Sequence, residues 1–296
     1  FDLVDPSERE VATRATRALP FQNAPTLVPE HDKTLLARNP HTMDFSDEIG
    51  FQFSGLVYPV DDLILSFLFS AASRHSAFDA VVVTDTFGIE SIDHRLIENK
   101  TLSFPEISDD RYSPYQEIYV QAEYSGIDRL PLILGFQQKR NVIFYDRLLV
   151  EIPDPNIEVA ETTTGMIDGT WSFDRRHSLH GILEVQSVFE SKKIVAAIDS
   201  AGIAADDGKF ANLLATLEFS RSPLWSLNAR VEWSSTDKEQ GGRQVWPVVG
   251  GTYRIGRSHT LGAQYGYERG GIVCTGGVCR FISPFTGFRV SLVSQL

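Results

Sequence analysis

Alternation of apolar and polar residues recurs through most of this chain and constrains its fold more than any other feature of the sequence. In residues 225–234, "WSLNARVEWS", one side carries Trp225, Leu227, Ala229, Val231 and Trp233, and the other carries Ser226, Asn228, Arg230, Glu232 and Ser234. A period of two is typical of a β-strand whose two faces meet different surroundings. The pattern predicts eleven strands, over residues 49–58, 63–72, 115–124, 130–138, 164–173, 178–190, 210–220, 225–234, 244–255, 259–268 and 285–296. We therefore expect an all-β fold.

The connections between the predicted strands alternate in length. Short turns such as "DRRH" and "RSP" follow every other strand, and longer segments separate the remaining pairs, at residues 73–114, 139–163, 191–208, 236–243 and 269–284. Outer-membrane barrels have short periplasmic turns on one rim and long extracellular loops on the other. The sorting favours an antiparallel transmembrane β-barrel. A soluble secreted β-sandwich stays the alternative, because alternation by itself fits both folds.

Composition narrows the classes of protein further. No apolar run approaches the ~20 residues of a membrane-spanning helix, and the most apolar segment, residues 63–72, has the length of a tilted membrane strand. A net charge of −12 argues against binding to nucleic acid. The apolar faces carry aromatic residues, many near strand ends, as in the interfacial girdles of membrane proteins: Trp171, Phe173, Trp225, Trp233, Tyr253, Tyr265, Tyr267 and Phe288.

Strand parity predicts that the visible strands are not the whole barrel. In an antiparallel series of eleven, the first and last strands run in the same direction and cannot pair antiparallel with each other. We expect an intact barrel of twelve or fourteen strands, with the missing part before Phe1. Residues 1–48 are interpreted as an irregular extracellular loop with a short helix over 9–19, and residues 49–296 as the barrel.

The polar faces of the predicted strands supply the candidate functional residues. Six charged side chains are predicted to face the lumen: Glu184, Glu218, Arg230, Glu232, Arg254 and Arg289. Glu218, Arg230 and Glu232 lie on neighbouring strands, where charges on one face can pair across strands. In an open barrel the six would line a passage for small solutes, and in a filled barrel they would form a structural polar network. The sequence leaves both readings open.

The two cysteines lie close together before the last predicted strand. Cys274 and Cys279 enclose "TGGV", whose glycines suit a tight turn. Two thiols in an exported protein most often pair, so we expect a disulfide that braces the tip of the last long loop. A metal site would need further ligands, and none is predicted. Motifs for a catalytic nucleophile or a nucleotide cofactor do not occur, so neither catalytic residues nor cofactors are predicted.

The C-terminal segment carries the resemblance to known proteins. "GIVCTGGVCRFISPFTGFRVSLVSQL" resembles the tail of an uncharacterised family of bacterial outer-membrane barrels, a domain of unknown function. Alternating Phe288, Val290 and Leu292 with a terminal apolar residue resemble the signal that Gram-negative barrels present to their assembly machinery, although Leu296 stands where an aromatic residue is usual. The resemblance implies the outer membrane as the location, lipid and lipopolysaccharide as surroundings, and protein partners at the extracellular loops. It brings no catalytic residues.

One enzyme class remains as an alternative. Asp93, His94, Asp109 and Asp110 lie in the long connection 73–114. Omptin-like outer-membrane proteases use a His/Asp pair facing an Asp/Asp pair, with a water activated between them. In omptins these groups lie on different strands at the barrel rim, whereas here one connection holds all four, so a solvated loop is the favoured interpretation. The sequence thus predicts a non-enzymatic barrel, either a narrow channel for small solutes or a scaffold subunit of an outer-membrane complex.

Overall fold

The computed structural model describes eleven stretches of the chain and one further residue, 86. These are residues 35–38, 48–74, 76–84, 86, 90–99, 112–113, 115–144, 157–194, 203–236, 242–256, 258–275 and 278–294. The side chains of β3, β4 and β14, most of those of β13, and those at the long-connection ends of several strands lie outside the description. The predicted helix over 9–19 also falls outside it.

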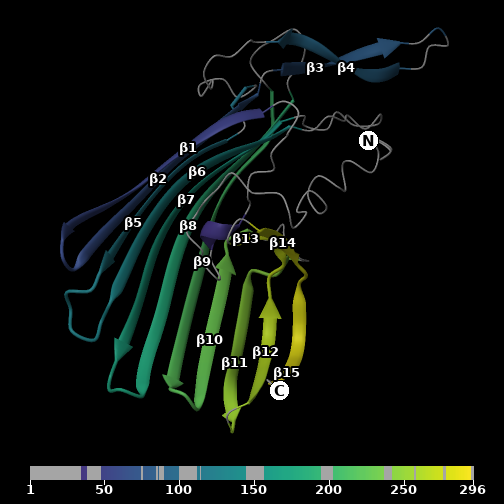
Figure 1. Cartoon of the computed structure of the whole chain (residues 1–296). Helices are drawn as coiled ribbons and strands as arrows, with labels where there is room; N and C mark the ends of the chain where they lie inside the picture. The colour runs from purple at the N-terminus through teal and green to yellow at the C-terminus, as the bar shows by residue number, and fades with distance from the viewer. Residues whose placement is uncertain are drawn as a thin grey trace.

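Eleven strands form one antiparallel sheet, in the order β1-β2-β5-β6-β7-β8-β9-β10-β11-β12-β15 (Figure 1). Their bounds are β1 Glu48–Val60, β2 Leu63–Arg74, β5 Tyr115–Tyr124, β6 Leu132–Phe144, β7 Ile157–Ser172, β8 His177–Ile194, β9 Ile203–Arg221, β10 Trp225–Ser234, β11 Val245–Ile255, β12 His259–Glu268 and β15 Phe285–Ser294. Each corresponds to one of the predicted strands. The prediction of an all-β, antiparallel, barrel-type fold is confirmed.

Two hairpins and one turn of helix complete the described part. β3 (Ser76–Thr84) pairs with β4 (Glu90–Asn99), and β13 (Gly271–Thr275) pairs with β14 (Val278–Ile282). Neither hairpin was predicted from the sequence. The 3₁₀-helix η1 covers Leu35–Ala37, and within the described residues no helix is long and apolar enough to cross a membrane.

The central strands extend further than their alternation predicts. β7, β8 and β9 have 16, 18 and 19 residues, and their ladders continue to the pairs Phe144↔Ile157 and Ile194↔Ile203. Backbone hydrogen bonds hold these outer segments together, and such bonds do not require a regular pattern of side chains. The alternation of polarity therefore marks only the inner part of each strand.

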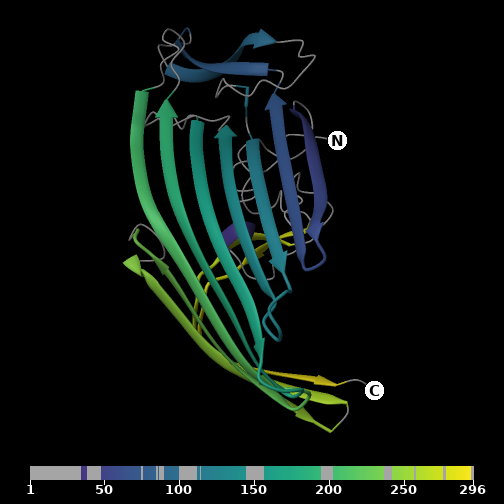
Figure 2. The ribbon, with the colours of Figure 1, turned by 90° about the vertical axis from the view of Figure 1, so that its left-hand side faces the viewer.

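The sheet curves into a trough with its turns sorted by length (Figure 1, Figure 2). The short turns lie at one end, whereas the strand ends that lead into the longer connections, and the β3–β4 hairpin, lie at the other. This sorting was predicted and is confirmed. β1 and β15 are the two edges of the sheet, so the sheet is not closed within the described residues.

The sheet exposes its apolar face and buries its polar face, which is the reverse of a sheet in a water-soluble protein. η1 lies inside the trough and contacts Glu184, which is fully buried, so Glu184 marks the concave face. Its neighbour Val185 points to the convex face and is 52% exposed. Further large apolar residues are exposed from one side of the sheet to the other, among them Phe53, Val120, Leu134, Trp171, Leu217, Val249 and Leu292. The convex face is therefore apolar and open, and the concave face is polar and largely covered.

The turn between β7 and β8 is held by one aspartate. The Asp174 carboxylate accepts hydrogen bonds from the backbone N–H groups of Arg176 (2.7 Å) and His177 (2.9 Å) and lies 2.9 Å from the His177 ring. The hydrogen bond from the His177 ring has the largest effect, and together these bonds lower the pKa of Asp174 to about 2. Next to the turn, the tilted rings of Trp171 and Phe173 are in contact, with centroids 4.6 Å apart, which gives this end of the convex face an aromatic border.

Gly266 offers a direct test of the β11–β12 pairing. Its φ is +147°, and a Cβ would come within 2.2 Å of the Pro247 carbonyl oxygen. Gly266→Ala is expected to lower the free energy of unfolding by about 2 kcal/mol or more, because backbone would have to move. Gly165→Ala is the control, since a Cβ there meets nothing within 4 Å. Urea titrations of both variants measure the difference, and equal midpoints would contradict the described register.

Candidate functional site

The concave face is organised in rows that cross neighbouring strands. Directly opposite residues form the row Gln137, Thr164, Gln186 and Asn212 on β6 to β9. Two residues nearer the short turns lies the row Met166, Glu184, Leu214, Glu232 and Trp246 on β7 to β11. Each of these side chains is buried. The rows bring polar groups from distant parts of the sequence to one level of the trough.

η1 docks onto these rows through its backbone. The Leu35 N–H donates to Glu184 Oε2 (2.7 Å), and Gln186 Nε2 donates to the Leu35 carbonyl (3.2 Å). Lys139 Nζ donates to the carbonyl of Arg38 (2.6 Å). One turn of helix leaves most of its N–H and C=O groups without partners of its own. The wall of the trough supplies those partners.

Apolar contact fixes the same segment from a second side. Leu36 packs in a buried cluster with Leu68, Tyr119 and Met166. Leu36 is 1% exposed, so it is covered as completely as a core residue. The segment Leu35–Arg38 is thus part of the packed interior of the trough.

Glu232 joins two arginines that come from distant parts of the chain. Its Oε2 accepts from Arg38 Nη2 at 2.7 Å, and its Oε1 accepts from Arg269 Nη1 at 2.9 Å. The side chains of Glu232 and Arg269 are 1% and 6% exposed. The guanidinium of Arg269 also lies over the Trp246 ring, 5.0 Å from its centroid. Loss of one partner would leave an uncompensated charge in a buried site, so the structure depends on these contacts.

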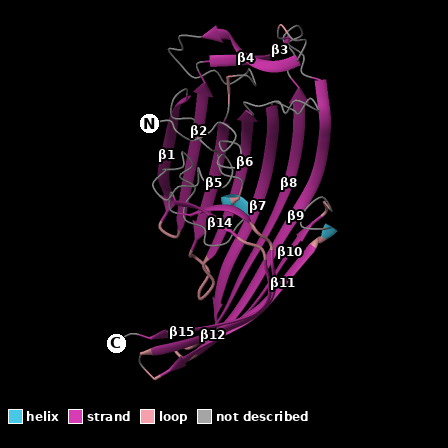
Figure 3. Ribbon diagram, turned by 90° about the vertical axis from the view of Figure 1, so that its right-hand side faces the viewer, coloured by secondary structure: helices cyan, strands magenta, loops and turns pink. Residues whose placement is uncertain are grey.

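The β13–β14 hairpin, which follows Arg269, also lies in the trough. Arg269 lies just before β13, and the hairpin is seen beside η1 on the concave side (Figure 3). β13 runs next to η1, with Cα atoms within 8 Å. Two separate segments therefore occupy the trough together.

The predicted disulfide has a compatible backbone. Cys274 is directly opposite Cys279 in the β13–β14 register. Opposite residues of an antiparallel pair have Cα atoms about 4.5–5.5 Å apart, within the range of disulfides. The two side chains lie outside the described part, and the disulfide stays a prediction.

A second buried network lies on β5. Glu117 accepts hydrogen bonds from Tyr115 Oη and Gln137 Nε2, both at 2.6 Å. The Tyr119 hydroxyl donates to Gln121, which in turn donates to Glu123 at 2.7 Å. These side chains alternate along one strand, so the polar network continues toward the edge of the trough.

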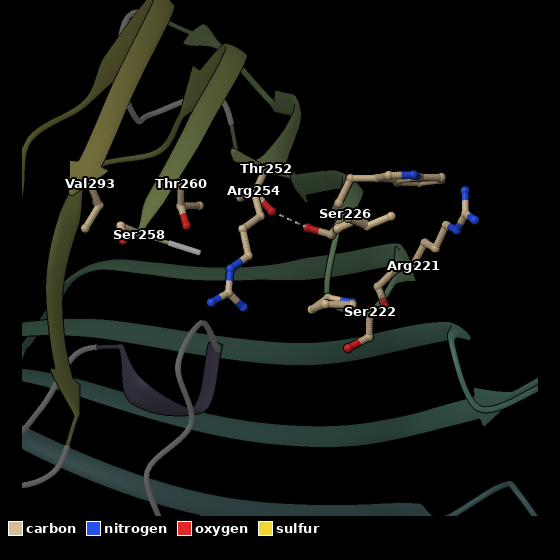
Figure 4. A pocket seen from close by; sticks show the side chains of 12 residues that line it. Arg221, Ser222, Ser226, Thr252, Arg254, Ser258, Thr260 and Val293 are labelled. Atoms are coloured by element: carbon tan, nitrogen blue, oxygen red, sulfur yellow. Dashed lines mark hydrogen bonds between the residues drawn. The ribbon is translucent and has the colours of Figure 1, made fainter. Parts of the chain in front are cut away.

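The short-turn end of the concave face contains a cavity of about 490 Å³ (Figure 4). Ser226, Thr252, Ser258 and Thr260 line it together with Arg254. A row of hydroxyl groups crosses the strands at this level through Ser172, Ser178, Ser220, Ser226 and Thr252. Two pairs in the row are hydrogen-bonded, Ser178 to Ser220 at 2.8 Å and Ser226 to Thr252 at 3.0 Å. We call this feature the hydroxyl-lined mouth.

The structure distributes the six predicted lumenal residues over four places. Glu184 and Glu232 hold the two segments inside the trough, and Arg254 lines the hydroxyl-lined mouth. Arg230 and Arg289 lie 3.6 and 3.7 Å from the two oxygens of Glu268. Glu218 lies opposite His180 and Asn228.

The pairing that the sequence suggests among Glu218, Arg230 and Glu232 is not the one found in the described residues. Glu232 pairs with arginines that lie outside the strands, and Arg230 pairs with Glu268 two strands away. Arg38 and Arg269 were missed because their positions depend on how two connections fold back. Lys139 could have been found, since Gln137, Lys139 and Asn141 continue the alternation beyond the predicted end of the strand.

The protease alternative gains no geometry from the structure. Asp93 and His94 lie on β4, opposite Val81 and Ala80, and their side chains lie outside the description. Asp109 and Asp110 are likewise outside it. Among the residues that are described, no group of three or more His, Cys, Asp or Glu is placed to hold a metal ion.

A curved antiparallel sheet with an apolar convex face and a polar, filled concave face defines the class as a barrel-type β-protein. Residues 7–296 match a family of unknown function, DUF6029, and the chain belongs to that family. No match is found among curated proteins.

Two solved structures show a loose likeness to the chain. A TodX deletion mutant, described as a monoaromatic hydrocarbon channel, is 8% identical with a TM-score of 0.32, over 84% of this chain and 69% of that one. The toluene transporter TodX of Pseudomonas putida has the same identity and TM-score, over 83% and 68%. A likeness this loose carries no argument about what the present chain binds or does.

Removing the charge of Glu232 tests its role as the shared anchor. Glu232→Gln leaves the buried guanidinium of Arg269 and the partly buried one of Arg38 without their carboxylate, so the free energy of unfolding is expected to fall by about 3–5 kcal/mol. Glu218→Gln, on the same face and in contact with neither arginine, is expected to change it by about 0.5 kcal/mol or less. Urea titration compares the two, and an equal, small effect would contradict the assignment.

Proposed function

We propose that this chain forms a β-barrel of the bacterial outer membrane and acts as a narrow, non-enzymatic channel for small polar solutes. The observation that carries this proposal is the reversed distribution of residues across the sheet. Fully buried Glu184 stands next to Val185, which is 52% exposed, and the same contrast recurs along the other strands.

The exposed convex face fits lipid better than water. Soluble proteins rarely expose contiguous apolar patches beyond a few hundred Å². Here exposed apolar residues occur on strands from β1 to β15, for example Phe53, Leu134, Val185, Leu227 and Leu292. Acyl chains would cover these side chains at no cost. A soluble β-sandwich would instead bury this face.

The concave face fits a polar passage. Charged and amide side chains cover its middle, and the hydroxyl-lined mouth continues the polar surface to the short-turn end. Hydroxyl groups both donate and accept hydrogen bonds, so they can replace the water of a small polar solute. Leu35–Arg38 and the β13–β14 hairpin, named the plug from here on, occupy the trough. The described arrangement corresponds to a closed channel.

The long connections would face the outside of the cell. Barrels of this class have their short turns in the periplasm. The β3–β4 hairpin and the other long connections would then meet lipopolysaccharide and any protein partner. A scaffold subunit of a larger complex would use the same surface, and it is the competing outcome of the measurement below.

A charged residue on the convex face distinguishes lipid from water. Val185→Arg is expected to destabilise the protein by about 2–4 kcal/mol in lipid vesicles, because the guanidinium would enter the hydrocarbon core. Leu224→Arg, in the β9–β10 turn and 43% exposed, is the matched control with an expected cost of about 0–1 kcal/mol. Urea titration of the folded protein in vesicles measures both. Equal, small costs would indicate that the convex face meets water.

Planar-bilayer recordings test the channel directly. The unchanged protein is expected to give rare, brief openings because the plug fills the trough. Glu232→Gln is expected to lengthen the openings by loosening the plug, whereas Glu218→Gln should behave like the unchanged protein. Silence from all three folded proteins, together with partners that co-purify, would favour the scaffold.

A further inference from the structure

We propose that the two segments of the plug are one coupled unit, so that release of either segment releases the other. This inference rests on the proposed function only in treating the trough as a passage. The coupling itself stands on contacts among buried residues. The proposal adds to the observation of a filled trough because it predicts that the two segments are released together.

The first link between the segments is the carboxylate of Glu232. One oxygen holds Arg38 of the N-terminal segment at 2.7 Å, and the other holds Arg269 of the β12–β15 connection at 2.9 Å. An ion pair is strong in a dry site and weak in a wet one. When either arginine leaves, water reaches Glu232, and the remaining pair loses most of its strength.

The second link is a chain of hydrogen bonds that bypasses Glu232. Arg269 Nη1 donates to Asn212 Oδ1 (3.3 Å), and Asn212 Nδ2 donates to Gln186 Oε1 (2.9 Å). Gln186 Nε2 then donates to the carbonyl of Leu35 (3.2 Å). Each of these side chains is buried, and an amide can satisfy both neighbours only in one orientation. Loss of Arg269 therefore frees Asn212 to turn and weakens the hold on Leu35.

The third link is the proximity of the two segments. β13 and η1 have Cα atoms within 8 Å of each other, and both lie on the concave side of the sheet (Figure 3). Arg269 also covers Trp246. Removal of the hairpin would expose the same wall that Arg38 uses. Together the three links make a half-released plug less stable than either the closed or the fully released state.

Hydrogen–deuterium exchange read by mass spectrometry tests the coupling in the full chain, folded in detergent micelles. Arg269→Gln is expected to speed exchange about tenfold or more in the peptide that contains Leu35–Arg38, although Arg269 does not contact that segment in the described bonds. Arg38→Gln is expected to speed exchange as much in the peptide that contains residues 271–282. Arg289→Gln is the control, since Arg289 is on the same sheet but faces Glu268.

Changes confined to the segment that carries the substitution would overturn the proposal. A peptide from the middle of β8 reports whether the sheet itself opens. If the β8 peptide also exchanges faster, the milder variants Arg269→Lys and Glu232→Asp are compared instead. The two segments are then expected to lose protection together and before β8. Earlier loss of protection in β8 would contradict the proposal. Hydrogen exchange is measured independently of ion conduction. If the two segments lose protection together but the protein does not conduct, the channel proposal is wrong and the coupling stands. If the protein conducts but the segments lose protection independently, the coupling is wrong and the channel proposal stands.

Discussion

The hydrogen-bonded ladder between neighbouring strands is the constraint on which the rest of this structure depends. Because side chains alternate between faces, the pairing of β8, β9 and β10 places Glu184, Leu214 and Glu232 at one level of the concave face. A slip of one residue would bring Val185 into the trough and turn Glu184 outward. The position of every anchor for the plug therefore follows from strand pairing rather than from local sequence.

The pairing of the strands buries carboxylates on the concave face, and the plug supplies their partners. Buried carboxylates are costly unless charges or hydrogen bonds compensate them. Glu184 receives the Leu35 N–H, and Glu232 receives two guanidinium groups, so the filling of the trough stabilises its wall. The wall in turn provides partners for a helical turn too short to satisfy its own backbone. Neither the polar face nor the plug is explained without the other.

The sequence predicted the structure where polar and apolar side chains alternate regularly. It did not predict contacts that form when a long connection folds back onto the sheet. Alternation located the eleven strands and put Glu184 and Glu232 on the polar face. It gave no sign of β13–β14, whose strands have five residues each, or of β3–β4 in a connection interpreted as a loop. Arg38 could not be assigned, because its partner is 194 residues away and nothing periodic connects them. Periodicity reports what a strand does locally, whereas the contents of a trough depend on long connections.

The position of the plug within the sheet bears on how it could move. Thr164, Glu184, Gln186 and Asn212 belong to β7, β8 and β9, the three longest strands, which also pair with each other over their whole length. Such extensively paired strands are expected to open last, whereas short segments held by a few side chains open at lower cost. The plug consists of a four-residue stretch that is bonded to Glu184, Lys139 and Glu232, and a small hairpin that follows Arg269, whose guanidinium pairs with Glu232. Release of the plug would exchange a few buried polar contacts and the packing of Leu36 for water, without breaking the ladder that keeps the trough in shape.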